Sequence, residues 1–570
     1  MADKIRNWLS SVSNGVVFGL LILLFFFLFF ISIFSTCIMW YDHEVTYFIL
    51  DLSIFFLIGL AGLILFLSQK KKALLEVLSN RKKIIVIATL LWCVLLVGFS
   101  INTNIDLVVD QASVYEAITG LIKGDYTMWE MGGYMYDYPF QNGIVLLYTP
   151  LVMVFGESTY GVVQILNMLF FWLFAVAGYK FAQKYFDQFV AIFTYVGILF
   201  FIPLWGYVKY FYGNLPVICL AAWAAYLIFM FLEKDNWRYA LGSAICMMLA
   251  AAFKMNSLIY TIAIILVILI KSILVNKKSY LLAAVLISAA TFCGINGPAW
   301  IAHEITGQVT NGGIPFIEWI AMGLRECYVA PGWYNGAPYI RFMENGYSQE
   351  MSTAAALESI HESWKQFGEE KIYAFRFFVR KIASIWNNPE FESFAVIRKG
   401  NIHGTLSYWM KDILYNGGII NTILLIVMNI MHSIYLFGLL LYVTYFRKRK
   451  ELSGIIPLIA FIGGFLLHIF WEAKCQYTLI FFAGLLPYSF AGYRYTVFGI
   501  SSWLMKKKQN WLHKTNLWKG VAGLLLISII GAIVTYGLRI QGDEIEFLWA
   551  HKEKISWKAD SFPGEMEEWE

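Results

Sequence analysis

The sequence predicts an all-α polytopic membrane protein, and three observations lead to that fold class. Only 14% of the 570 residues are charged and 59% are hydrophobic, whereas soluble domains carry about 25% charged residues. Apolar runs long enough to cross a bilayer as helices recur along most of the chain. These runs are continuous, whereas the strands of a membrane β-barrel alternate apolar and polar residues. The net charge of +5 lies in short clusters beside the runs, which indicates topology and not a nucleic-acid partner.

The basic clusters set the expected orientation, because cytoplasmic loops are enriched in Lys and Arg. With clusters such as Lys70–Lys72, Arg81–Lys83 and Arg447–Lys450 inside, the N-terminus is inside and the C-terminus outside. The first run lacks a small-residue cleavage site, so it is predicted to be a retained anchor. The sequence predicts about thirteen spans, near 14–38, 46–68, 84–101, 160–182, 188–206, 214–233, 238–254, 256–275, 279–297, 417–446, 453–471, 476–499 and 517–537.

One apolar segment, QNGIVLLYTPLVMVFG at 141–156, is short and contains Pro150. If it spanned the membrane, every later basic cluster would lie outside, so it is predicted to be a helix in the outer interface. The expected organisation is therefore five parts. They are two extra N-terminal spans with a cytoplasmic basic loop at 1–83, a transmembrane module at 84–300 with a first outer loop at 102–159, an extracytoplasmic subdomain at 301–416, C-terminal transmembrane helices at 417–540, and an acidic outer tail at 541–570.

The first outer loop opens with VDQASVYEA, in which Asp110 precedes an amphipathic stretch that Gly124 ends. Val114, Ile118 and Leu121 follow at helical spacing, so the stretch is predicted to be a surface helix with Asp110 as its N-cap. Two interpretations stay open. Asp110 is only a cap and the tyrosines that follow are only interfacial anchors, or Asp110 is a general base directed at a hydroxyl nucleophile. Asp106, four residues earlier, is the reserve candidate.

The pattern Asp110…Tyr115…Gly124…Tyr138-Pro139…Phe155-Gly156 resembles the GT-C glycosyltransferase superfamily, in particular the protein-mannosyltransferase-like and aminoarabinose-transferase-like membrane enzymes. The resemblance covers roughly 84–300 and, more loosely, 417–500. It implies a GT-C-like helical core that takes a sugar from a polyprenyl-phosphate lipid on the outer face and passes it to a glycan, lipid or protein. It also implies substrate contacts by Tyr115 and Tyr138. Many members carry Asp-Glu where this chain has Asp110-Gln111, which leaves Asp110 as the main acid.

A lipid-phosphate donor needs cations at the outer helix ends. Lys209, Lys254 and Lys474 are predicted to lie there. Members of the superfamily often open a late helix with E-x-x-x-R-Y. In this chain Glu472, Lys474, Gln476 and Tyr477 take similar places, and a helix N-terminus also favours a phosphate. The alternative is that each lysine only reaches toward lipid headgroups.

The second outer loop is predicted to hold a helix at Phe316 to Leu324, followed directly by Arg325. By analogy Arg325 contacts phosphate, and the alternative is a surface ion pair. The later text KIYAFRFFVRKIASIWNNPEF predicts an interfacial helix. Its expected apolar face consists of Phe375, Phe378, Ile382 and Trp386. His468, one turn before Glu472, is either part of an acid–base pair or a buried hydrogen-bonded histidine.

The leading hypothesis is an inverting glycosyltransferase in which Asp110 is the base. The alternatives are a transporter or flippase of lipid-linked sugars and a non-catalytic cell-envelope assembly protein. Few polar residues fall in mid-span, which disfavours transport. No cofactor is expected, because the lipid-linked sugar is a substrate and the first outer loop has no Asp-x-Asp metal motif. The seven cysteines form no zinc or disulfide pattern. The Lys-, Ile- and Tyr-rich composition is typical of a multi-pass bacterial cell-membrane protein.

Overall fold

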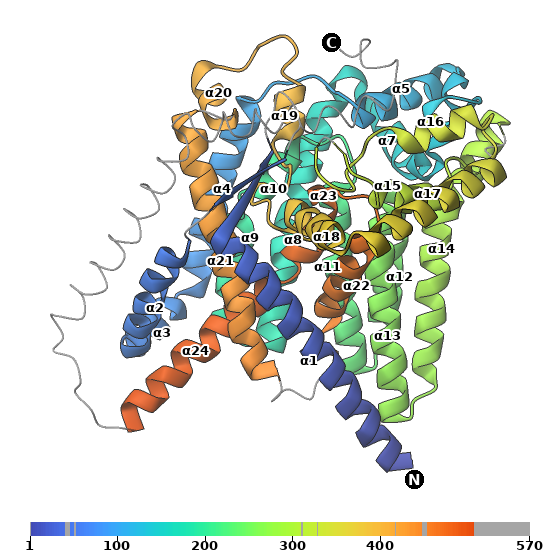
Figure 1. Ribbon diagram of the computed structural model, residues 1–570. Coiled ribbons are helices and arrows are strands. Elements are labelled where there is room, and N and C mark those ends of the chain that lie inside the picture. Colours follow the sequence, from blue (N-terminus) through green and yellow to red (C-terminus); the bar gives the residue numbers. More distant parts are fainter. Residues whose placement is uncertain are drawn as a thin grey trace.

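The structure is a computed structural model that describes residues 2–39, 46–50, 53–308, 312–327, 329–415, 418–446 and 453–506. Its described part is a bundle of helices, which confirms the predicted fold class (Figure 1). A small antiparallel ribbon accompanies the bundle. Its strands, β1 (Ser35–Met39) and β2 (Thr46–Leu50), pair from Ser35↔Leu50 to Met39↔Thr46. Helices dominate because a continuous apolar run in lipid must satisfy its backbone hydrogen bonds within itself.

The bundle consists of long helices that run side by side and of shorter helices that join or flank them (Figure 1). They are α1 (Ala2–Phe34), α2 (Ile54–Gln69), α3 (Lys71–Ser79), α4 (Arg81–Ile101), α8 (Thr159–Tyr185), α9 (Gln188–Leu199), α10 (Pro203–Gly206), α11 (Asn214–Lys234), α12 (Trp237–Phe253), α13 (Leu258–Val275), α14 (Ser279–Thr306), α21 (Ile419–Phe446), α22 (Ile456–Phe470), α23 (Cys475–Ala483) and α24 (Leu486–Lys506). Short 3₁₀ turns, η4 (Tyr207–Lys209) and η5 (Met255–Ser257), precede α11 and α13.

Seven stretches of the described chain are long and apolar enough to cross a membrane, and a bent pair, α9 with 203–209, makes an eighth. Shorter apolar helices lie at Phe56–Gln69, Trp237–Phe253 and Ile456–Phe470. Two predicted spans are wrong as continuous helices. The span at 188–206 bends by 49° before Pro203, and the span at 476–499 breaks before Pro487 into α23 and α24. In both cases proline has no N–H to continue the preceding helix. The predicted span at 517–537 lies outside the described residues.

The spans predicted at 14–38 and 46–68 are also wrong at one end. Residues after Phe34 form β1, and the second run begins as β2 before α2 starts at Ile54. Hydrogen bonds far along the chain explain the change, because the Cys37 N–H donates to the Asn387 carbonyl at 3.3 Å and the Asn387 amide donates to the Ser35 carbonyl at 2.7 Å. Tertiary contacts thus override a local preference for helix.

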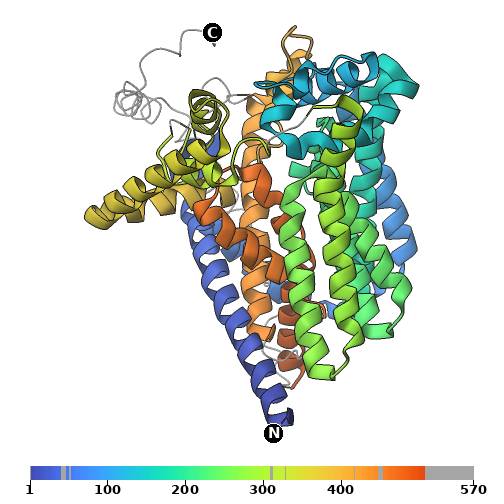
Figure 2. The ribbon, with the colours of Figure 1, turned by 90° about the vertical axis from the view of Figure 1, so that its right-hand side faces the viewer.

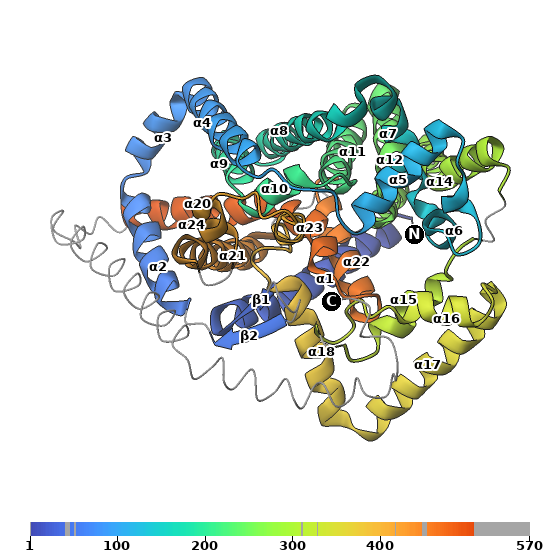
Figure 3. The same cartoon turned by 90° about the horizontal axis from the view of Figure 1, so that it is seen from above.

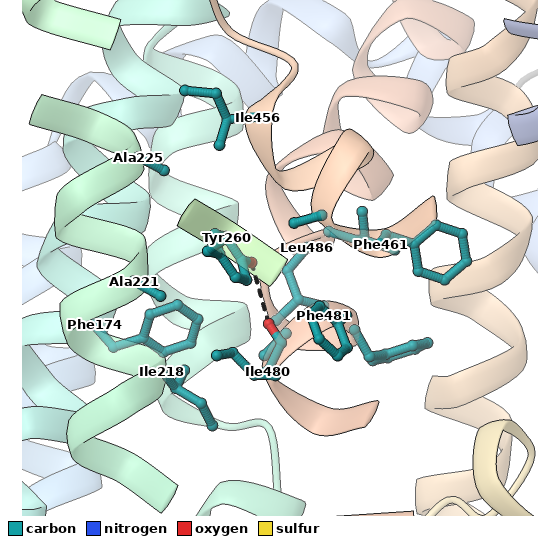
Figure 4. Close-up of a cluster of buried hydrophobic side chains, with 14 of the residues drawn as sticks. Phe174, Ile218, Ala221, Ala225, Tyr260, Ile456, Phe461, Ile480, Phe481 and Leu486 are labelled. Carbon is teal, nitrogen blue, oxygen red and sulfur yellow. Dashed lines mark hydrogen bonds between the residues drawn. The ribbon is translucent and has the colours of Figure 1, made fainter. Parts of the chain in front are cut away.

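The core of the bundle lies where α8, α11, α13, α22 and α23 meet (Figure 4). Phe174, Ile218, Phe461 and Phe481 are all almost fully buried there. The Tyr260 hydroxyl donates to the Ile480 carbonyl at 3.2 Å, which satisfies a buried polar group. This contact holds the first turns of α13 against the carboxyl half of α23, so the core fixes two segments whose first residues reach the site described below.

The two outer loops fold into helices of their own. The first contains α5 (Asp110–Lys123), η1 (Thr127–Trp129), α6 (Tyr134–Asp137), η2 (Pro139–Gln141), α7 (Asn142–Phe155) and η3 (Gly156–Ser158). The second contains α15 (Phe316–Gly323), α16 (Ala337–Glu344), α17 (Gln349–Glu369), α18 (Lys371–Trp386), α19 (Ala395–Lys399) and α20 (Tyr408–Leu414). Figure 2 shows α5 lying across the upper end of the long helices. Seen from above, α15 to α18 form an arc along one edge (Figure 3).

The helices predicted at 141–156 and from Phe316 both form, as α7 and α15. The carboxyl end of α7 exposes Met153 and Val154, which suits the predicted interfacial position without testing it. The apolar face predicted for α18 is wrong at its amino end. Ile382 and Trp386 are buried, whereas Phe375 is 70% exposed, because α18 packs only its carboxyl half into the body.

Close backbone contact between α7 and α12 gives the first testable prediction. A Cβ added at Gly143 would lie 1.9 Å from the carbonyl oxygen of Ala252, so Gly143→Ala must push the two helices apart. We expect a loss of about 1–3 kcal/mol in unfolding free energy, seen as a lower melting temperature of the detergent-purified protein. Gly161→Ala is the matched control, because a Cβ there meets nothing within 4 Å. Equal melting temperatures for the two variants would show that the helices do not pack this closely.

Candidate active site

The functional segment predicted around Asp110 begins with a strained residue. Val109 has φ 54° and ψ −141°, a conformation that a β-branched residue rarely adopts and that costs about 1–3 kcal/mol. Val109 occupies the N-cap position, and Asp110 is the first residue of α5. The prediction that Asp110 caps the helix is therefore wrong. Its carboxylate instead accepts a hydrogen bond from the Tyr134 hydroxyl, whose pKa burial raises well above its usual value.

Gln111 has a different role from Asp110. It is buried, and its side-chain oxygen accepts the N–H of Phe211 at 2.6 Å. Tyr115 packs its ring against Phe211 as well, with ring centroids 5.8 Å apart. These contacts hold α5 against the turn that precedes α11. A glutamine is an adequate acceptor for this bond, so the residue after Asp110 serves here to place the helix.

Lys254 lies between α12 and η5 and interacts electrostatically with Asp110. Its ammonium donates to the Asn214 side chain at 3.0 Å and lies 5.1 Å from the centroids of the Tyr212 and Tyr477 rings. Burial and the nearby Lys474 lower the pKa of Lys254 to about 7, while Asp110 and other carboxylates oppose the shift. Lys254 is thus a cation that changes its charge near neutral pH.

Glu472 and Lys474 lie in the short connection between α22 and α23. Ala473 between them donates its N–H to the Gly332 carbonyl at 2.7 Å, which ties the connection to the second outer loop. Burial raises the pKa of Glu472 to about 7, although Lys474 opposes it. For Lys474, burial lowers the pKa, but Glu392, Asp110 and Glu472 outweigh it and raise the pKa above its usual value.

Lys381 of α18 fixes the same connection from the other side. Its buried ammonium donates to the carbonyl oxygens of Gly323 and Trp471, at 2.5 and 2.8 Å. Burial lowers the pKa of Lys381 to about 7, while Glu472 opposes the shift. The residues Glu472 to Lys474 are therefore held by two independent attachments to the second outer loop.

Tyrosines surround the charged groups. The Tyr138 hydroxyl bonds with Tyr334 of the second loop, and its ring packs on Trp319 with centroids 6.2 Å apart. Tyr212 bonds with Tyr134 and with the Gln141 side chain. Burial raises the pKa of Tyr138, Tyr212 and Tyr334, so these hydroxyls remain protonated. They can donate hydrogen bonds to an anion or to sugar oxygens at ordinary pH.

The structure brings six of the predicted site residues into one group. They are Asp110, Tyr138, Lys254, Glu472, Lys474 and Tyr477. His468 bonds with the Glu472 carbonyl at 3.4 Å and stacks on Tyr477. It is a buried histidine with a backbone partner, which was one of the two interpretations.

The other predicted site residues have different surroundings. Lys209 is buried and donates to the Ser100 carbonyl at 3.2 Å and to Gln164 at 2.9 Å. Asp106 is half exposed and lies 3.8 Å from His403. Arg325 pairs with Glu362 at 2.5 Å on an exposed surface, which is the alternative of a surface ion pair. Tyr115, described above, packs α5 in place.

Sequence reasoning missed Glu392, Tyr212 and Tyr334. Glu392 lies in the turn after α18 and faces Lys474 and Lys254. These residues are far apart in the sequence and come together only through tertiary packing, so no local pattern pointed to them. Within the described residues no cluster of His, Cys, Asp and Glu is suited to hold a metal ion, and metal dependence stays untested.

Residues 145–294, which run from within α7 to within α14, match the family model of dolichyl-phosphate-mannose-protein mannosyltransferase, a family of the GT-C superfamily. This match supports a membrane glycosyltransferase of the GT-C type. No curated protein matches the chain. Lys209 and Lys254 lie inside the matched residues, whereas Asp110, Glu392 and Lys474 lie outside them. The match therefore supports the GT-C helical core, and the roles of the charged group are taken up below.

Proposed function

We propose that this GT-C enzyme moves a sugar from a polyprenyl-phosphate donor to an acceptor hydroxyl, with inversion, at the extracytoplasmic face. The proposal is carried by one observation. The Asp110 carboxylate, at the start of α5, interacts electrostatically with two ammonium groups, those of Lys254 before η5 and Lys474 before α23. A phosphate needs the ammonium groups, and an attacking hydroxyl needs the carboxylate. The group thus contains both requirements of the reaction.

In the proposed reaction, the acceptor oxygen attacks the anomeric carbon while its proton passes to the Asp110 carboxylate. The bond between the anomeric carbon and the phosphate oxygen breaks, and its electron pair leaves with the phosphate. Lys254 and Lys474 stabilise the charge that develops on that oxygen. The leaving phosphate is already an anion, so no general acid is needed. Lys254 and Lys474 are two of the three lysines predicted for the phosphate, and Lys209 has no part in the proposed step because its contacts lie elsewhere.

Several features of the group suit this assignment. Asp110 is the first residue of α5 and lies at the positive end of that helix. The α23 N-terminus, which Lys474 precedes, offers backbone N–H groups to an anion. Tyrosine hydroxyls supply further donors for sugar oxygens, and buried aromatic rings such as Trp319 limit access of water. Each feature uses a residue that the bundle or the second loop holds in place.

The test is transfer by the purified full-length protein in detergent. A decaprenyl phosphate carrying a radiolabelled sugar is incubated with extracted cell-envelope lipid, glycan and protein fractions as acceptors. We expect label to move to one fraction and decaprenyl phosphate to appear in equal amount. If the same protein in vesicles moves the labelled lipid between leaflets without releasing decaprenyl phosphate, the function is transport and the proposal is wrong. If neither occurs with any fraction, a non-catalytic assembly role replaces it.

A further inference from the structure

The turn after α18 carries a carboxylate that the proposed reaction does not use. The Glu392 carboxylate accepts from the Cys475 thiol at 3.6 Å and from the backbone N–H of Gln476. These two residues open α23, so the carboxylate lies at the positive end of that helix. The same carboxylate faces the ammonium groups of Lys474 and Lys254. It therefore interacts electrostatically with both cations that the proposed function assigns to the donor phosphate.

The backbone at this turn is strained. Phe391 and Glu392 have φ angles of 52° and 62°, two successive left-handed residues that are not glycine. The strain is held by Tyr207, which donates to the Phe391 carbonyl at 2.6 Å, and by Tyr210, which donates to the Glu392 carbonyl at 2.8 Å. Such conformations persist only where the surroundings impose them, and they gather at functional sites.

A buried ion pair anchors the same turn. Glu390 and Arg398 lie 2.8 Å apart and both are almost fully buried. The Phe394 N–H also donates a hydrogen bond to the Glu390 carboxylate at 3.1 Å, which holds the two ends of the turn together. The ring of Phe391 is fully buried against Phe482, with centroids 5.1 Å apart. The fold thus fixes the backbone of this turn, and the Glu392 carboxylate lies at the start of α23, which directly follows Lys474 in the chain.

We propose that Glu392 is a positioning residue of the donor site, which keeps the ammonium groups of Lys254 and Lys474 charged and in place for the phosphate. The inference rests on the proposed function, because the phosphate is the ligand that gives these lysines their role. Two like charges close together in a buried place repel each other, and each favours loss of a proton by the other. A fixed carboxylate that interacts with both lysines offsets that repulsion.

The other groups that face these lysines matter for the sign of the effect. Around Lys254 they are Lys474, Asp110, Glu392 and Glu472, with the rings of Tyr212 and Tyr477. Around Lys474 they are Glu392, Asp110, Glu472, Cys475, Lys254 and Lys399. Glu472 titrates near neutral pH, and Asp110 is needed as the base. Burial raises the pKa of Glu392, while Lys474, Lys254 and the hydrogen bonds from Cys475 and Gln476 oppose the shift. Glu392 is the carboxylate of this group to which the proposed reaction gives no other role.

The decisive variant is Glu392→Gln. Glutamine still accepts the Gln476 N–H, so the start of α23 keeps its hydrogen bond while the charge is lost. Lys254 holds its proton below its pKa of about 7, and without Glu392 that pKa falls further. Donor affinity, which needs the charged lysine, is then lost at lower pH. We expect the donor KM at pH 7.5 to rise about tenfold with kcat little changed, and the alkaline fall of kcat/KM to shift down by about one pH unit.

Two further variants separate charge from structure. Glu392→Asp keeps the charge and is expected to keep the wild-type pH midpoint. Asp412→Asn is the matched control, because Asp412 accepts the N–H groups of Ile419 and Ile420 at the start of α21, at 2.8 and 3.1 Å. It removes a capping charge outside the donor group and is expected to leave the donor KM and the pH midpoint unchanged.

Binding of farnesyl phosphate, measured by calorimetry in detergent from about pH 5.5 to 9, tests the inference apart from catalysis. We expect wild-type and Glu392→Asp proteins to share one pH midpoint of affinity and Glu392→Gln to have a lower one. A Glu392→Gln protein with wild-type affinity and midpoint overturns the inference, and so does an equal loss of affinity at every pH. If the wild type binds farnesyl phosphate with the expected pH dependence but transfers no sugar, the proposed function fails and the role of Glu392 in anion binding stands.

Discussion

Asp110→Asn is expected to lower sugar transfer by about 10²–10⁴-fold, because general-base catalysis contributes a factor of that size. Asparagine keeps the shape of the side chain and still accepts the hydrogen bond from Tyr134, but it cannot take the acceptor proton. The donor KM is expected to change little, since the base acts on the acceptor. Initial rates of labelled-sugar transfer by the purified variant, over a range of donor concentrations, measure both constants.

The matched control is Asp106→Asn. Asp106 lies in the same loop, is half exposed and contacts His403 at 3.8 Å. We expect it to keep near wild-type transfer, and both variants to keep the wild-type melting temperature. A normally folded Asp110→Asn protein that retains most of its activity would falsify the assignment of the base. Equal losses for the two variants would indicate a general effect of loop charge and not a base.

Lys474→Met is expected to lower transfer by about 10²–10³-fold, which is the usual cost of removing one group that stabilises developing negative charge. The variant removes the cation that interacts with Asp110, Glu392 and Glu472, so donor affinity falls as well as kcat. Steady-state kinetics with the labelled donor give both changes. Lys474→Arg retains the charge and is expected to recover part of the donor affinity.

Loss of a buried cation also threatens stability, because neighbouring carboxylates are left without a partner. Lys209→Met serves as the control for this effect. Lys209 is equally a buried lysine, with its ammonium on Ser100 and Gln164. We expect Lys209→Met to lower the melting temperature while the folded protein keeps its kcat/KM. If Lys209→Met and Lys474→Met lose the same catalytic efficiency per folded molecule, Lys474 has no special part in donor binding.

Much of the fold was predictable because membrane helices leave strong local signals. Apolar length gave the spans, and Gly124 ends α5 in a left-handed conformation as predicted. The breaks before Pro203 and Pro487 could also have been predicted from the prolines themselves, but the uninterrupted apolar sequence around them favoured one continuous span. The β1–β2 ribbon had none, because a run that suits a helix becomes a strand only through its contacts with Asn387.

The candidate site was predictable in part for a related reason. Asp110 and Lys474 each lie at a helix start beside an apolar run. A charged residue in that position can be recognised from a single sequence as a candidate functional residue at the membrane surface. Glu392 stands in a turn with no periodic pattern, and its left-handed backbone depends on tyrosines about 180 residues earlier. The cap predicted at Asp110 failed because Val109 adopts a strained conformation that residue preferences disfavour.

The attachments of the site give it two separately built halves. Gln111 binds the half that carries Asp110 to the turn before α11, whereas Gly332 and Lys381 bind the half that carries Lys474 to the second outer loop. Tyr138 of the first half contacts Tyr334 and Trp319 of the second outer loop and so links the two halves. Replacing residues 312–386 with those of a related enzyme would therefore change how Lys474 is held and so how the lipid phosphate is bound. The position of Asp110 relative to the helical bundle would stay the same.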